Sequence, residues 1–412
     1  MDWTKTQKRI LLVAWLGWVF DIMDAALFNF AKVPMLTAML GKAEYDRIGP
    51  AIEGRIQSVF LLGWAIGGLV FGILADRWGR MRTLTATILI YSIFTGITAL
   101  CQNPEQVMVA RFITALGIGG EWAAGAALVA EAFRDTKRGP AAAILQSAAA
   151  LGPALAAGAS LVLRHQSWHW LFVVGIVPAL ITVGLRYAVR EGETVTADRP
   201  ADAGSPLALL RHPVYGRRVI AATVIGAVGV IGAQTATYWM PNLVKAASVG
   251  LSTAEVSART AYVTWVSHIG TLLGVFCVPW LAERFGRRRT IAAFFVIAPL
   301  VVFAAVGSGA TYERLFALSP LINFFAIGVS AAFVLYFPEL FPGKFRAIGS
   351  GLAYNTGRLL AIPVPMITGQ VTAGGSPITS AVVLSGSVYV IGLLAIPFAV
   401  ETKGEPLPEL DG

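Results

Sequence analysis

Twelve apolar runs, each about 20 to 25 residues long, follow one another along this sequence of 412 residues. A helix that crosses the hydrocarbon core of a bilayer needs roughly 20 apolar residues, whereas barrel strands are about 10 residues long and alternate in polarity. Because lipid offers no partners to backbone polar groups, each run is expected to form a helix. The runs lie near 10–33, 56–76, 84–102, 106–131, 140–163, 168–189, 218–241, 260–282, 290–308, 314–337, 347–370 and 378–400.

The composition supports a membrane protein. Charged residues make up 13% of the chain, and mean hydropathy is +0.69. A soluble domain carries about 25% charged residues, so too few polar groups are present to cover a soluble core. The formal net charge of +9 is spread along the chain rather than concentrated in a patch, so we expect no nucleic-acid partner. The first run carries Asp21 and Asp24 and lacks a small-residue cleavage site, so it is interpreted as a span rather than a signal peptide.

The basic residues divide unevenly between the two alternating sets of connections. One set holds 22 Lys and Arg residues and the other holds 7. The excess of basic residues marks the cytoplasmic side of a membrane protein. The sequence therefore predicts a multi-pass protein of the inner (plasma) membrane, with the N- and C-termini in the cytoplasm.

The two halves of the chain repeat one another. GILADRWGRMRT at 72–83 returns as PWLAERFGRRRT at 279–290, and VREGE at 189–193 returns as VETKGE at 400–405. The most polar stretch, 190–216, lies between the halves. This pattern predicts an N-terminal six-helix bundle at 1–189, a cytoplasmic linker at 190–216 and a C-terminal six-helix bundle at 217–412. Halves related in this way are found in transporters whose site lies at the midplane.

These motifs carry a family resemblance. GILADRWGRMR resembles the loop motif between the second and third spans of the major facilitator superfamily, and RFITALGIGGEWAAG (111–125) is similar to its fourth-span pattern. YFPELFP (336–342) and VETKGEPLPE (400–409) resemble the ends of its tenth and twelfth spans. The resemblance covers the whole chain. It implies an all-α membrane protein with twelve transmembrane helices in two pseudo-symmetric six-helix bundles, closest to the sialate/lactate and aromatic-acid proton symporter branches.

The resemblance also implies charged latches at the cytoplasmic rim. An alternating-access transporter needs contacts that hold one state and release in the other, and acid–base clusters at the ends of spans suit this role. The alternative is that these charges only anchor the topology. The candidate gating residues are Asp76, Arg80 and Glu131 in the first half, and Glu283, Arg287 and Glu339 in the second.

Four ionisable residues inside the first four predicted spans are candidates for proton coupling. Asp24 lies roughly 13 Å below the outer end of its span and Arg111 roughly 9 Å below the same surface, so the two side chains can face each other. Charged groups inside a bilayer are costly, and their presence favours a function. Asp21 and Glu121 are the reserve candidates. The alternatives are a purely structural Asp24–Arg111 ion pair and a Glu121 that only bonds backbone amides.

Polar residues in the second half are candidates for substrate binding. Arg358 keeps its charge at any accessible pH and lies near the middle of the eleventh predicted span, with Asn355 on the same helical face. Gln234 and Tyr238 form a polar stripe on the seventh span, and His268 lies in the eighth. The last three residues could instead hold helices together through hydrogen bonds. With Asp21, Asp24, Glu121, Arg111 and Arg358 counted, the interior carries a net charge of about −1, which one proton would neutralise.

Two classes of function follow from these residues. The first is a secondary active transporter that couples protons to the symport of a small organic anion, such as a monocarboxylate, a sialic acid or an aromatic acid. The second is a uniporter, a symporter of a neutral sugar or zwitterionic osmolyte, or a non-transporting membrane sensor. No enzyme motif stands in a suitable context, and His165 and His169 lack an evident third metal ligand. We therefore expect no enzyme activity, no cofactor and no metal, with protons, the substrate and the lipid bilayer as partners of a monomer.

Overall fold

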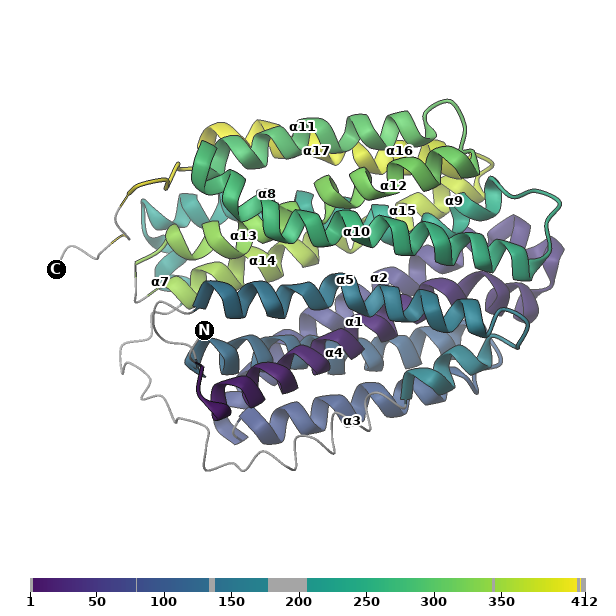
Figure 1. Ribbon diagram of the computed structural model, residues 1–412, viewed down its shortest axis with the longest axis horizontal. Helices are drawn as coiled ribbons and strands as arrows, with labels where there is room; N and C mark the ends of the chain where they lie inside the picture. Colours follow the sequence, from purple (N-terminus) through teal and green to yellow (C-terminus); the bar gives the residue numbers. More distant parts are fainter. Residues whose placement is uncertain are drawn as a thin grey trace. The chain divides into compact units, whose positions relative to one another are not determined.

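The computed structural model describes residues 3–78, 80–132, 138–176, 206–342, 345–405 and 408. Within these residues every regular element is a helix (Figure 1). Eight helical segments are long and apolar enough to cross a membrane. The chain is therefore a multi-pass, all-α membrane protein.

The first five spans form long helices. These are α1 (Lys5–Leu40), α2 (Lys42–Trp78), α3 (Arg80–Thr98), α4 (Pro104–Ala132) and α5 (Arg138–Val162). A capping box between Thr4 and Gln7 starts α1, and Gly41 with φ +80° ends it. The sixth predicted span begins as helix at 169 and runs out of the described residues after 176.

The second half is built from shorter pieces. They are α7 (Pro206–Arg211), α8 (Tyr215–Tyr238), α9 (Met240–Ala246), α10 (Thr253–Phe285), α11 (Arg287–Val306), α12 (Tyr312–Ala326), α13 (Val329–Glu339), α14 (Arg346–Ala361), α15 (Pro363–Ala373), α16 (Ile378–Gly386), α17 (Val388–Ala395) and the 3₁₀ turn η2 (Ile396–Phe398).

Three predicted spans of this half are interrupted near their middle. The breaks fall between α12 and α13, between α14 and α15, and between α16 and α17. Pro363 accounts for the second break, because proline has no N–H to donate to the backbone ladder of α14. At the first break, a Cβ on Gly274 of α10 would lie 2.8 Å from the Cα of Gly328. The backbones of the two segments are therefore in direct contact.

The structure differs from the sequence prediction at the connection between the first two spans. The apolar runs ended at 33 and resumed at 56, which predicted a loop between them. In the structure α1 and α2 continue through this stretch and only Gly41 separates them. A helix continues beyond the apolar part of a span wherever its backbone bonds and buried contacts persist, so hydropathy alone underestimates its length.

The chain divides into two compact units. The first comprises Met1–Ala197 with Ser248–Trp265 and Pro365–Ser376, and the second comprises Asp198–Ala247, Val266–Val364 and Pro377–Gly412. The predicted linker at 190–216 lies largely outside the described residues, so the predicted three-part division stays a prediction.

Glycine contacts hold the first unit together. A Cβ on Gly67 would lie 2.1 Å from the carbonyl oxygen of Leu116, and one on Gly119 would lie 2.1 Å from that of Trp64. Helices α2 and α4 therefore touch along their backbones, which is how membrane helices gain packing energy without a hydrophobic driving force. The GIGG sequence of α4 contributes Gly119 to this contact.

Candidate functional site

A buried ion pair joins α1 to α4 inside the first unit. Arg111 Nη1 donates to Asp24 Oδ2 over 3.0 Å, and each side chain is 1% exposed. The hydroxyl of Thr95 on α3 donates to the other carboxylate oxygen, Oδ1, over 2.6 Å. The structure thus brings together the two residues that the sequence paired and adds a hydroxyl that it did not identify. Both oxygens of the Asp24 carboxylate are engaged from different helices.

Aromatic rings hold the Arg111 guanidinium in place. Its central carbon lies 4.7 Å from the ring centroid of Phe28 and 4.7 Å from that of Phe60. Cation–π contacts of this kind contribute about 0.5–2 kcal/mol each, more when water is excluded. Within the described part of the chain, the buried Nε of Arg111 makes no hydrogen bond. The cation is therefore held by one carboxylate and two rings, with donor capacity to spare.

The two reserve acids are also buried. Asp21 is fully buried one turn before Asp24 on α1, and Glu121 is 3% exposed on α4. A second buried pair lies further along α1, where Lys32 Nζ is 3.0 Å from Glu53 Oε2 of α2. Both side chains of this pair are 0% exposed. The pair is neutral, so it leaves the interior charge of about −1 unchanged.

The candidate substrate residues all belong to the second unit. Arg358 on α14 is 8% exposed and lies over the ring of Tyr354 at 4.7 Å, while Asn355 is half-buried on the same face. Gly357 brings α14 against α8, since a Cβ there would be 2.8 Å from the backbone nitrogen of Ala227. Arg358 lies one residue beyond this contact on α14, and Gln234 lies seven residues beyond it on α8. The two residues are therefore offset by roughly 9 Å along the helix axes.

The other members of the predicted substrate site differ in their surroundings. Gln234 is half-buried, and Tyr238 is 1% exposed with its ring edge-on to Trp239. His268 is buried on α10, and its Nδ1 lies 3.1 Å from the hydroxyl of Ser267. Arg358 and Asn355 thus lie on α14, Gln234 and Tyr238 lie on the neighbouring helix α8, and His268 lies beside Ser267 on α10.

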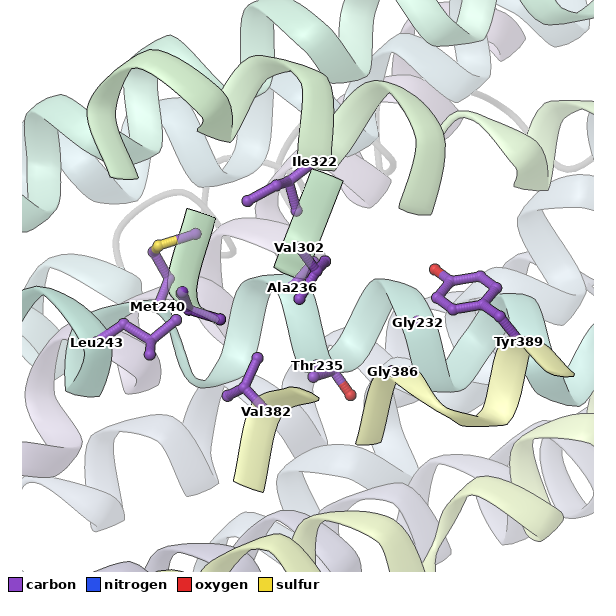
Figure 2. Close-up of a pocket in the computed structure, with 11 residues that line it drawn as sticks. Gly232, Thr235, Ala236, Met240, Leu243, Val302, Ile322, Val382, Gly386 and Tyr389 are labelled. Atoms are coloured by element: carbon purple, nitrogen blue, oxygen red, sulfur yellow. The ribbon is translucent and has the colours of Figure 1, made fainter. Parts of the chain in front are cut away.

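A small cavity lies on a different face of α8. Its lining includes Gly232 and Thr235 of α8 and Tyr389 of α17 (Figure 2). It encloses about 20 Å³, close to the space that one water molecule needs and far below the several hundred Å³ of a ligand pocket. The Tyr389 hydroxyl is buried and has no hydrogen-bond partner among the described residues. This cavity is too small to be the substrate site.

Residues 14–365 match the sequence profile of the Major Facilitator Superfamily. The chain belongs to the Major Facilitator Superfamily. It is a transporter and not an enzyme.

Several named transporters are similar to this chain over almost its whole length. A probable 4-methylmuconolactone transporter of Cupriavidus pinatubonensis is 32% identical over 97% of this chain and 91% of its own length. A cis,cis-muconate transport protein of Acinetobacter baylyi is 28% identical over 97% and 96%, and the niacin transporter NiaP of the same species is 27% identical over 88% and 87%. The relatives agree with the organic-acid branch that the motifs indicated.

Solved structures show the same fold. A crystal structure of a mutant of the nucleoside transporter NupG superimposes with a TM-score of 0.74, at 14% identity, over 94% of this chain and 99% of NupG. A bacterial homologue of the human lysosomal transporter Spinster gives a TM-score of 0.66 at 16% identity, over 96% and 95%. The predicted major facilitator fold is confirmed.

One of the two predicted superfamily latches is described. Arg287 and Glu339 form a bidentate ion pair with distances of 3.0 and 2.9 Å, and Thr402 donates to Glu339 over 2.5 Å. Glu283 is exposed and takes no part in this pair. The side chains of Asp76, Arg80 and Glu131 lie outside the described residues, so the first cluster stays a prediction, as does the gating role of both clusters.

Glu401 completes this cluster and was missed by sequence reasoning. Its carboxylate accepts hydrogen bonds from the backbone N–H groups of Arg287 and Arg288 over 2.8 and 3.1 Å, at the start of α11. The preceding residue, Gly286, has φ +100° and no side chain to cap the helix. An anion at a helix N-terminus is stabilised by the free N–H groups and the helix dipole. The sequence did contain a signal for Glu401. It is the first Glu of VETKGE, which follows the last span and repeats the VREGE that follows the sixth span.

Among the described residues, no group of three or more His, Cys, Asp or Glu side chains could hold a metal ion. His169 Nδ1 is instead 2.6 Å from the hydroxyl of Ser167.

Proposed function

We propose that this chain is a proton-coupled symporter of a small organic anion that works by alternating access. The observation that carries the proposal is the Asp24 carboxylate, which is 1% exposed and held by Arg111 and Thr95 from two other helices. Residues that carry protons across membranes are buried acids of this kind with a defined partner. We further propose a monomer in the inner membrane with both termini in the cytoplasm, on the basis of the 22-to-7 asymmetry of basic residues.

Asp24 is the proposed proton carrier. When Asp24 accepts a proton, the ion pair with Arg111 is lost, but Arg111 stays charged and stays between Phe28 and Phe60. The guanidinium then has donors to offer that Asp24 no longer occupies. The proton also offsets the negative charge that an anionic substrate brings into the interior, which links proton loading to anion binding.

Arg358 is the proposed contact for the substrate carboxylate. A guanidinium offers a carboxylate two parallel hydrogen bonds, and Asn355 on the same face supplies a neutral polar group. Gln234 and Tyr238 on the adjacent helix α8 add further polar groups, and His268 on α10 is a further candidate. The names of the relatives support this substrate class, since muconate and niacin are both carboxylic acids.

The proposed switching elements are the two charge clusters of the repeat. The Arg287–Glu339 pair with Thr402 ties α11, α13 and the C-terminal segment together. Asp76, Arg80 and Glu131 are proposed to form the equivalent cluster in the first half. Asp76→Asn is expected to reduce transport while leaving substrate affinity nearly unchanged, because it alters the balance of states rather than the binding site.

Uniport is the second candidate function. The same geometry favours it in one respect, since both Asp24 oxygens are already bonded, as they would be in a purely structural pair. A neutral sugar, a zwitterionic osmolyte or a sensor role are further alternatives in this class.

Proteoliposomes distinguish the two candidates. The test measures uptake of nicotinate, cis,cis-muconate, sialic acid and a neutral sugar into vesicles, with and without an inwardly directed proton gradient. We expect at least one carboxylate to accumulate above equilibrium only with the gradient. Uptake that merely equilibrates, with or without the gradient, would establish uniport.

A further inference from the structure

The buried Lys32–Glu53 pair has no role in the coupling scheme above. Both side chains are 0% exposed, and Lys32 Nζ lies 3.0 Å from Glu53 Oε2. The Tyr45 hydroxyl donates to the other oxygen, Glu53 Oε1, over 2.5 Å. Lys32 follows Asp24 by eight residues on α1, so the two lie on one face, roughly 12 Å apart along the axis.

Burial of this pair is difficult to explain by stability. Removing two charges from water is costly, and replacing a buried ion pair by apolar residues is often neutral or stabilising. Ionisable residues inside a membrane therefore point to a function. The choice of lysine is informative, because an ammonium is a point charge with three rotatable donors that can change partners, whereas a guanidinium prefers one fixed bidentate partner.

We propose that Lys32 and Glu53 form a proton-linked binding site for the carboxylate of the transported acid. A proton binds to Glu53 Oε2, and the Lys32 ammonium then passes from Glu53 to the incoming carboxylate. The cluster is neutral before the exchange, with one cation and one anion, and neutral after it, with the ammonium and the substrate carboxylate beside a protonated Glu53. No covalent bond of the substrate changes. This inference rests on the proposed function, since it requires an organic acid that moves with protons.

The groups around Glu53 suit this exchange. Tyr45 continues to donate to Oε1 whether Oε2 is ionised or protonated, so Glu53 remains positioned. Helix α15, which packs on α2, contains no titratable residue. Arg111 from α4 is occupied by Asp24 and two aromatic rings. Lys32 is thus the cation whose contact with Glu53 depends on the charge of the Glu53 carboxylate.

Helix α15 lies close to the Lys32–Glu53 pair within the first unit. A Cβ on Gly54, the neighbour of Glu53, would lie 2.2 Å from the carbonyl oxygen of Pro365, and one on Gly369 would lie 2.2 Å from that of Pro50. Helix α15 therefore covers α2 beside the pair in the present state. Each contact sets a glycine of one helix against a proline carbonyl oxygen of the other. Separation of α15 would open the site to substrate.

The test removes both charges together. In the Lys32→Met/Glu53→Met variant no unpaired charge remains, so the protein is expected to fold and to unfold within about 3 °C of wild type. Its matched control is Glu44→Met/Arg47→Met, which removes an exposed ion pair from the same helix α2. If the double Met variant fails to fold, Lys32→Gln/Glu53→Gln replaces it.

The measurements are nicotinate and cis,cis-muconate uptake and the number of protons taken up per substrate in proteoliposomes. We expect the buried-pair variant to show a KM at least tenfold higher and a lower proton-to-substrate ratio, while the control matches wild type. Glu53→Gln alone is expected to retain binding through Lys32 but lose the proton that Glu53 carries. A buried-pair variant with the wild-type KM and proton ratio would overturn the inference. Absence of proton uptake in wild type would instead refute the proposed function itself.

Discussion

The Glu401 carboxylate offers a direct test of how the C-terminal segment stabilises the second unit. It accepts hydrogen bonds from the backbone N–H groups of Arg287 and Arg288 at the start of α11, and also from those of Thr402 and Lys403. Glu401→Gln retains the shape and one acceptor oxygen but removes the negative charge. The variant therefore isolates the contribution of charge at this helix N-terminus.

The size of the effect follows from these contacts. Loss of an anion at a helix N-terminus costs about 0.3–1 kcal/mol and up to about 2 in partly buried geometries. Replacing charge-assisted hydrogen bonds by neutral ones adds about 1 kcal/mol. The free energy of unfolding should fall by about 1–3 kcal/mol, which corresponds to a Tm lower by about 2–10 °C for a unit of this size.

The assay is thermal unfolding of the purified protein in detergent, followed by tryptophan fluorescence. Glu405→Gln is the matched control, because Glu405 belongs to the same segment but is exposed. Its Tm should stay within about 1 °C of wild type, as for most surface substitutions. An equal Tm for the two variants would show that the Glu401 charge contributes nothing at α11, and the reasoning would be refuted.

Three further outcomes are expected. Arg358→Lys should weaken equilibrium binding of a monocarboxylate about tenfold or more, because lysine cannot reproduce two parallel hydrogen bonds, and unchanged affinity would remove Arg358 from the site. Gly357→Ala should lower Tm by several degrees because its Cβ would lie 2.8 Å from the α8 backbone, whereas Gly351→Ala, with nothing within 4 Å on the same helix, should not; equal effects would contradict this packing. In a cysteine-free background, cysteines placed at Val249 and Glu405 should react with an impermeant reagent from opposite sides of the membrane, and labelling from one side would refute the predicted orientation.

Sequence reasoning reached the fold and one ion pair because both leave a clear signal in the hydropathy of the sequence. Apolar runs of span length predict helices, and the repeat predicts two halves. Asp24 and Arg111 could be paired because each lies well inside an apolar run, where a charge needs a partner and depth can be counted from the ends of the span.

The same reasoning missed Glu53 for a physical reason. The stretch before residue 56 is polar, so it was assigned to a connection, whereas α2 begins at Lys42 and carries Glu53 into the interior. Lys32 was then left without a visible partner. Thr95 and Glu401 were missed because a hydroxyl, or a carboxylate beyond the end of a span, gives little hydropathy signal.

The most direct test of the proposed function is substrate-induced proton uptake into proteoliposomes, compared between wild type and Asp24→Asn. Asparagine keeps the size of the side chain and can still accept from Thr95 or Arg111, but it cannot bind the transported proton. Glu105→Gln, a change at an exposed acid of α4, is the matched control. The number of protons taken up per substrate should be the same in wild type and Glu105→Gln and should fall in Asp24→Asn, while exchange of substrate across the membrane persists. Equal proton uptake in Asp24→Asn and wild type would contradict the assignment of Asp24 as the proton carrier.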